Sequence, residues 1–460
     1  MKKTTHFLLG CMAAFGGCIQ SGDRSDASLD VVRIVTDAAA DDTPRATRDG
    51  QTYDPRCSAR RPVVGFGSAS GPDRCEGVTP PAQGTGSTWC SLGADVPGLM
   101  APRGLCVRRY AEVPLARVMS LAPNGDLFVT SPSAVTAAGD SGGRAAIVVL
   151  SDDNQDGVAE VTTFASGQLD TVHGIVVADG YVYFTTIDSV QRTPYRPGQR
   201  TETPGAREFL VGDASRDPLG VQFQRGIRWT HGLARSVNGR LIATRGEYSS
   251  CGVSGDGRPS TGSGEIYEGG ARSLTRMAAG FRNPMYARCH YCKDLCLAAE
   301  LGEDQSTGAV ETLVVLDGAD RWHGYPCCYQ RNAGPQSGNG LCNCIDEPAA
   351  RINLGDTPFG FDWERGAWPE PYRNGLFVAL HGSLYVAPFA NAGVAFLPTD
   401  PATGVPRATT PTRFLEATNR NPVNPLQRPS DVVFARDGRM FVSDDRGGSV
   451  FWLAPLDWRR

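Results

Sequence analysis

Pairs of short apolar strands, each pair joined by a tight-turn sequence, recur along the chain. In each clear copy an alternating apolar run leads into Asn-Gly or Asp-Gly, and a second apolar run ends in small polar residues. These copies span Ser120–Ser131, Ile175–Thr186, Leu233–Glu247 and Val433–Asp445. Asn-Gly and Asp-Gly supply the positive φ angles of a two-residue hairpin turn, and the alternation buries one face of each strand. Each copy therefore predicts a β-hairpin.

Two weaker copies, Cys292–Gly302 and Tyr372–Ser383, bring the series to six. The six turns fall at Gly125, Gly180, Gly239, Asp294, Asn374 and Gly438. Successive turns are 55, 59, 55, 80 and 64 residues apart. This spacing matches radially arranged four-stranded blades, whereas turns in a β-sandwich, the structural alternative, fall about every 8 to 12 residues. We therefore predict an all-β chain whose main body is a six-bladed β-propeller.

The first residues have the pattern of an export signal. Lys2 and Lys3 precede an apolar run from Phe7 to Phe15, which is shorter than the roughly 20 residues that span a bilayer. The run ends in Gly16-Gly17-Cys18 and resembles a bacterial lipoprotein signal, in which Cys18 would be acylated. A plain signal peptide is the alternative. We expect an exported outer-membrane lipoprotein, facing the periplasm or the cell surface, that contacts the membrane only through its N-terminal lipid anchor.

The chain divides into four segments by composition. Residues 1–18 form the predicted signal, and residues 19–55, rich in Asp, Ala, Thr and Arg with little periodicity, suit a disordered tether. Residues 56–106 form a Cys-rich N-terminal extension. Residues 107–460 form the predicted propeller, which carries Cys-rich loop insertions.

Twelve of the 14 cysteines lie beyond the predicted signal. They are Cys57, Cys75, Cys90, Cys106, Cys251, Cys289, Cys292, Cys296, Cys327, Cys328, Cys342 and Cys344. Export favours disulfides. The alternative is zinc held by thiolates of Cys289-x-x-Cys292 and Cys342-x-Cys344.

Composition and charge narrow the class further. The chain has 55 glycines and 32 prolines, which favour turns over helices, and its 40% hydrophobic content is enough for a large core. A formal net charge of −4 provides no polybasic face. Nucleic acid is therefore not an expected partner.

Five short motifs are more specific than the repeat. They are Trp229-Thr-His-Gly-Leu233 with the following hairpin to Glu247, Gly280-Phe-Arg-Asn-Pro284 with Glu300-Leu-Gly-Glu303, Trp322-His-Gly-Tyr-Pro326, Phe377–Ser383, and Gln427-Arg-Pro-Ser-Asp431 with the strand to Asp445. Together they resemble the glucose/sorbosone dehydrogenase family. These are quinoprotein six-bladed propellers that use pyrroloquinoline quinone (PQQ) and calcium. The resemblance covers roughly residues 105 to 455.

The resemblance implies a set of catalytic residues. His231 matches the base that removes the hydroxyl proton, a role that suits a neutral imidazole near pH 7. Glu247 stands where the family has an aspartate that orients this histidine. Arg282, followed by Asn283 in the cofactor-binding loop, matches the arginine that polarises the quinone carbonyl.

The resemblance also implies further cofactor and metal contacts. Arg428 matches an arginine that pairs with a cofactor carboxylate, and His381 stands where glucose enzymes carry a lysine. Ser430 replaces a second arginine, so cationic contacts to the quinone are fewer. Backbone carbonyls at Gly302 and Glu303 match the loop that contributes to the quinone-bound calcium, although Glu303 replaces the family's proline.

Each of these residues also has a structural interpretation. His231 can cap a strand end by hydrogen bonding to backbone, and Arg282 with Asn283 can fix the loop before Pro284 by binding carbonyls. His173 stands at the same strand-start position in the preceding repeat. That duplication favours an architectural role for at least one of the two histidines.

A second calcium candidate lies outside the family motifs. Asp152, Asn154 and Asp156 alternate before Gly157, as in loops that wrap a hard cation. Thr163 occupies the twelfth position, where an EF-hand has glutamate, so a full EF-hand is rejected. The loop is therefore either a partial calcium site or an acidic Asx turn.

Three functions follow from these features. The first is a PQQ- and calcium-dependent oxidoreductase that oxidises a sugar or related alcohol or aldehyde and passes electrons to a separate acceptor. The second is a non-catalytic propeller that binds carbohydrate or protein. The third is a calcium-dependent lactonase-like hydrolase, because such enzymes share the six-bladed shape. Fold alone does not separate them.

Overall fold

The computed structural model of the chain divides into two units, residues 1–53 and residues 54–460, each considered by itself. It describes residues 47–48, 51–52, 96, 98–132, 135–136, 139–140, 145–167, 169, 171–211, 230–246, 264–270, 273–302, 310–318, 321–325, 328–329, 341–382, 392–417 and 427–456. The predicted signal and nearly all of the predicted tether lie outside these residues. In the first unit, β1 (Thr47–Arg48) pairs with β2 (Gln51–Thr52).

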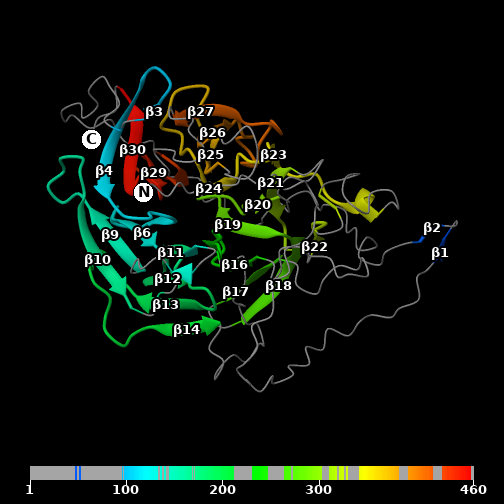
Figure 1. Cartoon of the computed structure of the whole chain (residues 1–460), viewed down its shortest axis with the longest axis horizontal. Coiled ribbons are helices and arrows are strands. Elements are labelled where there is room, and N and C mark those ends of the chain that lie inside the picture. Colours follow the sequence, from blue (N-terminus) through cyan, green and yellow to red (C-terminus); the bar gives the residue numbers. More distant parts are fainter. Residues whose placement is uncertain are drawn as a thin grey trace, which may run out of the picture. The chain divides into compact units, whose positions relative to one another are not determined.

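The second unit contains six sheets around a common centre, so the predicted six-bladed propeller is confirmed (Figure 1). Blade 1 consists of β5 (Met119–Leu121), β6 (Leu127–Ser131), β9 (Ala146–Ser151) and β10 (Glu160–Ser166). Blade 2 consists of β11 (Ile175–Ala178), β12 (Tyr181–Thr185), β13 (Val190–Pro194) and β14 (Glu208–Val211). Blade 3 consists of β15 (Leu233–Arg235), β16 (Leu241–Arg245), β17 (Gly264–Gly270), β18 (Ser273–Phe281) and an added β22 (Arg321–Trp322).

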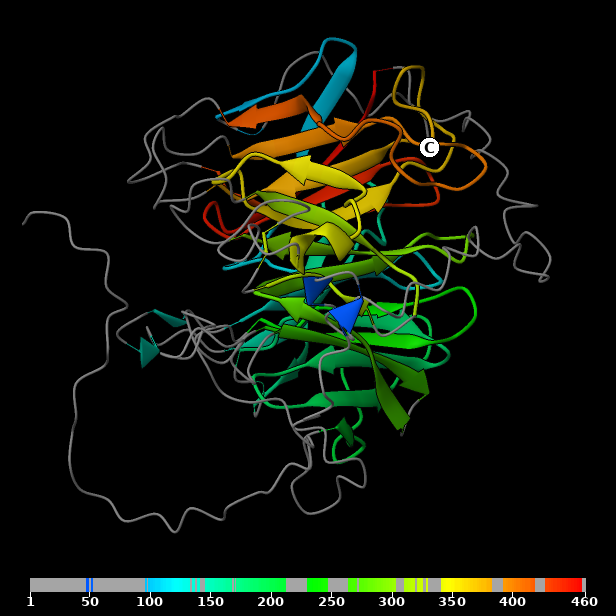
Figure 2. The same cartoon turned by 90° about the vertical axis from the view of Figure 1, so that its right-hand side faces the viewer.

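The remaining three blades follow in chain order, and Figure 2 shows the ring from the side. Blade 4 consists of β19 (Asn283–Cys289), β20 (Cys296–Leu301), β21 (Glu311–Leu316) and β23 (Ala350–Ile352). Blade 5 consists of β24 (Pro358–Trp363), β25 (Leu376–Leu380), β26 (Gly393–Leu397), β27 (Thr412–Ala417) and an added β3 (Leu99–Met100). Blade 6 consists of β28 (Pro429–Phe434), β29 (Met440–Asp444), β30 (Ser449–Pro455) and β4 (Leu105–Glu112).

Among the residues described in the second unit, three small elements lie outside the blades. β7 (Val135–Thr136) pairs with β8 (Gly139–Asp140), and η2 (Leu341–Cys344) is a short 3-10 helix. Among the described residues, no helix has the length and apolar character that crossing a bilayer requires.

The six predicted turns are the turns between the first two strands of the six blades. Each first strand is the innermost of its sheet, and neighbouring innermost strands contact one another around a closed ring. Gly125, Gly180, Gly239 and Gly438 have positive φ angles, and so does Asn374. The hairpin pattern therefore located the wall of the central axis in every blade.

The two ends of the second unit close the ring. β4 pairs antiparallel with β30 as the outer strand of blade 6, and β3 pairs with β27 at the edge of blade 5. Leu99–Met100 and the first residues of β4 thus belong to blades, and the propeller begins earlier than residue 107. The predicted Cys-rich extension contributes these strands to the ring.

Disulfides are present, as expected. Cys289 is bonded to Cys296 across the β19–β20 hairpin, and Cys328 is bonded to Cys342 in the insertion between β22 and β23. Cys292 is disulfide-bonded too. These bonds remove three of the four thiolates that the zinc alternative requires.

Candidate functional site

The six innermost strands all begin at the same end of the ring. Neighbouring strand starts lie side by side: Gly174 N donates to His231 O at 3.0 Å, and a Cβ on Gly232 would lie 2.7 Å from Met285 O. We call the end where these strands begin the start face, and the opposite end, where the first hairpins turn, the turn face. His231, Arg282 and Arg428 all stand at strand starts. They therefore lie on the start face, despite their separation in sequence.

His231 is enclosed by backbone in this structure. It is 1% exposed, and its Nδ1 and Nε2 each lie 3.1 Å from a carbonyl oxygen, of Thr244 and Ile187 respectively. Burial lowers the pKa of His231 to about 4, although the two carbonyls act to raise it. The imidazole is therefore neutral at pH 7, and its single N–H can satisfy only one of the carbonyls. This geometry is that of a backbone cap, and the catalytic role of His231 stays a prediction. Glu247 lies outside the described residues.

A repeated threonine binds the backbone of the histidine that starts the next blade in two places. Thr185 Oγ1 accepts from Gly174 N at 2.8 Å and donates to His231 O at 2.7 Å. Thr130 Oγ1 donates in the same way to His173 O at 2.9 Å. Each threonine thus joins its own inner strand to the next blade through a histidine carbonyl. This supports the architectural interpretation of the His173 and His231 backbone.

Arg282 and Asn283 are held by one carboxylate. Glu300 accepts from Arg282 N at 2.5 Å and from Asn283 N at 3.2 Å. The Arg282 guanidinium donates through Nη1 to Gly302 O at 2.6 Å. Arg282 is 4% exposed, so this buried cation is fixed at the start of blade 4. Glu303 lies outside the described residues.

His381 and Arg428 form one cluster with two residues that the motifs did not assign, Asp445 and Arg117. Arg428 donates through Nη2 to His381 Nδ1 at 2.7 Å and through Nε to His381 O at 3.1 Å. His381 Nε2 therefore carries the proton, and it lies 2.9 Å from Asp445 Oδ2. Arg117 Nη2 lies 2.9 Å from the same oxygen. We call these four residues the arginine cluster.

The charge states in the arginine cluster follow from burial and neighbours. Burial, with Arg428 and Arg117 close by, lowers the pKa of His381 to about 3, although Asp445 acts to raise it. Burial disfavours ionised Asp445, but His381 and the two arginines outweigh it and lower its pKa below the usual range. The cluster therefore holds two cations, one carboxylate and one neutral imidazole, and its net charge is positive.

A chain of aromatic rings crosses the axis beside the arginine cluster. The His381 ring stacks on Phe359 at 4.0 Å, Phe359 lies 5.4 Å from Tyr286, and Tyr286 lies 5.1 Å from His173. These rings come from blades 5, 4 and 2. Tyr286 is 3% exposed, and its hydroxyl has no hydrogen-bond partner among the described residues.

Two further carboxylates are buried on or near the axis. Asp431 Oδ2 accepts from Met119 N and from Arg288 Nη2, both at 2.8 Å, and burial raises its pKa to about 6. Asp444 Oδ1 accepts from Arg428 N at 3.0 Å, and burial raises the pKa of Asp444 to about 7. Asp444 thus fixes the backbone of Arg428 as Glu300 fixes that of Arg282.

The acidic loop in blade 1 is closed by its own hydrogen bonds. Asp156 Oδ1 accepts from Val158 N at 2.8 Å, Asn154 Oδ1 accepts from Asp156 N at 3.0 Å, and Asp152 Oδ1 accepts from Gly157 N at 3.4 Å. This is Asx-turn geometry. Across the residues that the structure describes, no three His, Cys, Asp or Glu side chains gather to hold a metal ion. The partial calcium site stays a prediction.

Sequence reasoning missed the residues that hold the site together. Arg117 had a usable signal, because it stands just before the first inner strand, as Arg282 and Arg428 do before theirs. Asp445 had a weaker one, its place directly after a second strand. Tyr286 and Phe359 had none, because apolar residues in inner strands are ordinary core.

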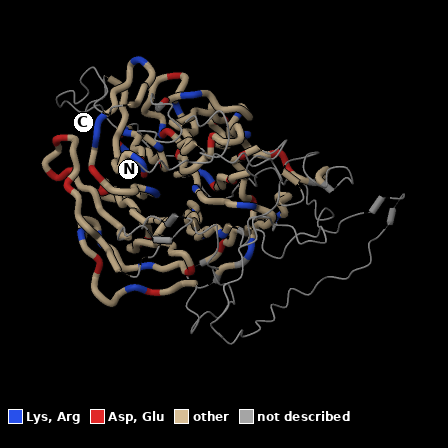
Figure 3. Tube along the Cα trace, in the orientation of Figure 1, with Lys and Arg blue, Asp and Glu red and all other residues tan. Residues whose placement is uncertain are grey.

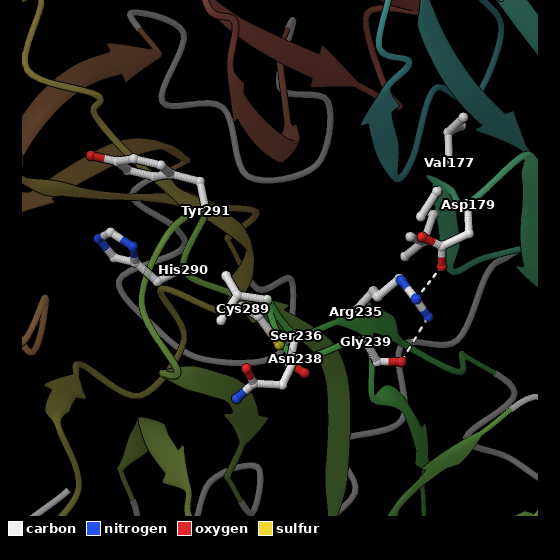
Figure 4. A pocket seen from close by; sticks show the side chains of 12 residues that line it. Val177, Asp179, Arg235, Ser236, Asn238, Gly239, Cys289, His290 and Tyr291 are labelled. Atoms are coloured by element: carbon white, nitrogen blue, oxygen red, sulfur yellow. Dashed lines mark hydrogen bonds and ion pairs between the residues drawn. The ribbon is translucent and has the colours of Figure 1, made fainter. Parts of the chain in front are cut away.

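A separate hollow lies on the turn face (Figure 4). It encloses about 540 Å³ between the first hairpins of blades 2, 3 and 4. Its cation, Arg235, is paired with Asp179 and donates to Gly239 O. In Figure 4 the rings of His290 and Tyr291 point away from Arg235. None of the predicted site residues lines this hollow.

The described part of the ring carries both basic and acidic residues. Lysines and arginines alternate with aspartates and glutamates along the described blades (Figure 3). The concentration of buried arginine on the start face is therefore local to the site.

Comparison with known proteins gives the fold and no closer assignment. No family model matches the chain, and no curated protein matches its sequence. Among solved structures, the PQQ domain of pyranose dehydrogenase from Coprinopsis cinerea is 18% identical with a TM-score of 0.62, over 79% of this chain and 99% of that one. A calcium structure of a Trichoderma reesei carbohydrate-active enzyme of family AA12 is 17% identical with a TM-score of 0.61, over 79% and 98%. A glucose dehydrogenase is 12% identical with a TM-score of 0.53, over 75% and 98%. The chain thus shares the fold of PQQ sugar dehydrogenases at low identity.

Proposed function

We propose that this protein is a PQQ-dependent oxidoreductase that oxidises a sugar or a related alcohol or aldehyde at the start face of its propeller. The observation that carries the proposal is the placement of three buried or half-buried arginines, Arg117, Arg282 and Arg428, at inner-strand starts of one face. Proteins of the same fold include a PQQ domain of pyranose dehydrogenase and a glucose dehydrogenase.

The donor set fits an anionic quinone. Burial lowers the pKa of Arg428, and the nearby Arg117 and Arg446 lower it further, although Asp445 and Asp444 act to raise it. Arg117 Nε is buried and has no hydrogen-bond partner among the described residues. A carboxylate of the quinone would pair with the Arg428 guanidinium and would accept a hydrogen bond from Arg117 Nε. Arg282, Arg428 and Arg117 are the side chains that would hold the quinone, which supplies a hydride acceptor when bound.

The described residues fit calcium less well than they fit the quinone. Gly302 O, the carbonyl expected to bind the ion, accepts from the Arg282 guanidinium at 2.6 Å. Because the Arg282 guanidinium already binds this oxygen, its positive charge would repel a calcium ion placed at the same oxygen. We therefore assign no step to calcium, and its presence stays a prediction.

Arg282 and His231 would have separate roles in substrate oxidation. Arg282 would stabilise negative charge that develops near its guanidinium, because it is fixed beforehand by Glu300 and Gly302. His231 would accept the hydroxyl proton at Nε2 once substrate replaces the Ile187 carbonyl there. A pKa of about 4 makes this imidazole a weak base in the structure as it stands, so the exchange must also raise its basicity.

A second candidate is a propeller that binds carbohydrate or protein without catalysis. The observation that favours it is the mutual satisfaction of His381, Arg428 and Asp445, together with the enclosure of His231 by two carbonyls. The lactonase-like alternative has no comparable support in the described residues.

The cellular setting completes the proposal. We propose that the chain is exported, is anchored through Cys18, and passes electrons from the bound quinone to a separate acceptor. Mass spectrometry of the purified membrane fraction tests the anchor, because acylation adds the mass of the lipid to a peptide that begins at Cys18.

Reconstitution tests the activity. The purified protein is titrated with PQQ, with and without calcium, and dye reduction is followed with a panel of aldoses and polyols. We expect a saturable spectral change at micromolar quinone, lost in Arg282→Ala and Arg428→Ala and kept in Arg235→Ala, a cation on the turn face. Binding without dye reduction would favour the binding module. No spectral change in the wild type would overturn the proposal.

A further inference from the structure

A short segment of blade 4 crosses to the edge of blade 3, next to Arg282. β22 lies between β21 and β23 in sequence, yet it pairs in parallel with β18, with Ala278 opposite Arg321 and Ala279 opposite Trp322. β18 is the strand that leads into Arg282. We call residues 321–325, which comprise β22 and the next three residues, the brace.

The brace continues along β18 to its last residue. His323 N donates to Ala279 O and Tyr325 N donates to Gly280 O, both at 2.8 Å. The His323 ring stacks on Phe281, with centroids 4.5 Å apart and an interplanar angle of 27°. Phe281 immediately precedes Arg282, so the contacts end one residue from the buried cation.

Trp322 covers the β-bulge at Gly280 in β18, two residues before Arg282. Gly280 has a φ of +82°, which favours glycine, and a Cβ there would lie 2.4 Å from Trp322 Cδ1. The indole therefore packs directly on the Gly280 backbone. The backbone conformation of Gly280 and the position of Trp322 therefore depend on each other.

The brace is itself anchored on its outer side. Arg321 Nη1 lies 2.5 Å from Asp346, and Cys328 N donates to Gly324 O at 2.8 Å. Cys328 is bonded to Cys342, and both are buried with Ile345 and packed by Trp322. The disulfide-closed insertion thus gives the brace a fixed support.

We propose that His323 and Trp322 are positioning residues for Arg282: through Phe281 and Gly280 they fix the backbone from which the Arg282 guanidinium reaches the start face. The inference rests on the proposed function only in taking an anionic quinone as the ligand of Arg282. Loss of the His323 ring removes the stacking partner of Phe281, so the backbone at Phe281 and Arg282 is held less firmly and the Arg282 N–H leaves Glu300 more often. The affinity for the quinone falls because the Arg282 guanidinium is no longer held in its binding position before the quinone binds.

The chain offers a matched control for His323. His290 makes a similar ring stack, on Tyr291, with centroids 4.4 Å apart at 25°. Burial lowers the pKa of both histidines, to about 4 for His323 and about 3 for His290, so both are neutral at pH 7. His290 stands at the turn face, far along β19 from Arg282. Removing it deletes a ring stack, and with it the acceptor of Cys292 N and Lys293 N, without touching the brace.

The experiment compares His323→Ala, His323→Phe and His290→Ala in the full chain. Two quantities are measured: amide hydrogen exchange of residues 278–283, and the dissociation constant for PQQ by fluorescence titration. We expect His323→Ala to speed exchange at Arg282 at least tenfold and to weaken PQQ binding about tenfold. His323→Phe, which keeps the ring stack, restores both, and His290→Ala changes neither.

Two results would overturn the inference: unchanged Arg282 exchange in His323→Ala, or equal effects of His323→Ala and His290→Ala. If the alanine variant does not fold, His323→Leu keeps the apolar volume without the ring and carries the same comparison. If the wild type binds no PQQ, the proposed function fails, while the exchange measurement still decides whether the brace positions Arg282.

Discussion

The ends of the second strands carry different chemistry in the two parts of the ring. In blades 1, 2 and 3 the second strand places a threonine, Thr130, Thr185 or Thr244, against the start of the inner strand. In blades 4 and 6 the next residue along the second strand is acidic: Glu300 and Asp444 accept from the N–H groups of Arg282 and Arg428. In blade 6 the threonine position itself holds Ser443, which donates to Arg117 O. We call these the threonine blades and the acidic blades.

The difference separates architecture from ligand chemistry. A hydroxyl both accepts and donates, so each of Thr130 and Thr185 can bind its own strand and the next blade without adding charge. A carboxylate only accepts, so it fixes the backbone before an arginine and also lowers the cost of burying that cation. The threonines of blades 1 to 3 link neighbouring strands and blades, and the carboxylates of blades 4 and 6 fix Arg282 and Arg428 on the start face, where Arg117 of blade 1 joins them.

The largest expected effect lies in the acidic blades, at Asp445. Asp445→Ala removes the carboxylate between Arg117 and His381, both largely buried. Breaking a buried pair by removing one partner costs about 3 to 5 kcal/mol. We expect the free energy of unfolding, measured by urea denaturation, to fall by about 3 kcal/mol.

A matched exposed pair shows whether burial causes the effect. Asp153 lies 3.0 Å from Arg200 but its side chain is 73% exposed. Exposed pairs contribute about 0 to 1 kcal/mol. A loss in Asp153→Ala as large as that in Asp445→Ala would contradict the role given to the arginine cluster.

The threonine blades should respond in stability alone. Thr185→Val keeps the shape of the side chain but removes the donor to His231 O and the acceptor of Gly174 N. Buried backbone groups that lose a partner cost about 1 to 3 kcal/mol. We expect the free energy of unfolding to fall by about 1 to 2 kcal/mol, with PQQ affinity unchanged. Thr163→Val, in an exposed part of β10, is the control, and a tenfold loss of PQQ affinity in Thr185→Val would refute the division.

The two sets of blades should also differ in the sign of their pH dependence. The folded pKa of Asp444 is raised to about 7, so its stabilising contribution is complete below about pH 4 and is lost as the pH rises to 7. The folded pKa of His231 is lowered to about 4, so its contribution is present above about pH 6.5 and is lost as the pH falls to 4. Asp444→Asn and His231→Asn should therefore shift the slope of unfolding free energy against pH in opposite directions. Equal shifts would contradict the assigned protonation states.

The smallest effect is expected at the acidic loop of blade 1. Its carboxylates already accept from backbone N–H groups, so the loop does not need an ion to close. We expect Asp156→Asn, which keeps an acceptor for Val158 N, to change the free energy of unfolding by less than about 0.5 kcal/mol. EDTA should leave the Tm of the wild type and the Tm of the variant unchanged. A fall in the wild-type Tm alone would support the partial calcium site instead.

The sequence was most informative for structures that residues adjacent in the chain determine. Each hairpin is specified by a few adjacent residues, such as Asn124-Gly125 between alternating strands, so blade number and inner strands could be predicted. The common end of His231, Arg282 and Arg428 followed from their place at strand starts. The start of the propeller could not be predicted, because β3 and β4 are defined by distant partners and not by a hairpin of their own.

The contacts within the site depended on long-range packing. Asp445 meets His381 and Arg117 only because three blades converge, and no spacing in the chain encodes this. The enclosure of His231 arises from a loop of the preceding blade, through Ile187 O. The pairing of Cys328 with Cys342, and the return of β22 to blade 3, likewise follow from the fold and not from spacing.

The pairing of β4 with β30 sets an order for biosynthesis. While a ribosome is still making blade 6, β4 has no partner, and the hydrogen-bonding edge that it will fill does not exist. The nascent chain must therefore carry an open edge until its last strand emerges, which makes this stage the one most exposed to proteases and to mispairing. Removal of Ser449–Pro455 would leave two unpaired edges at once, so even a short C-terminal truncation should yield aggregates instead of a smaller ring.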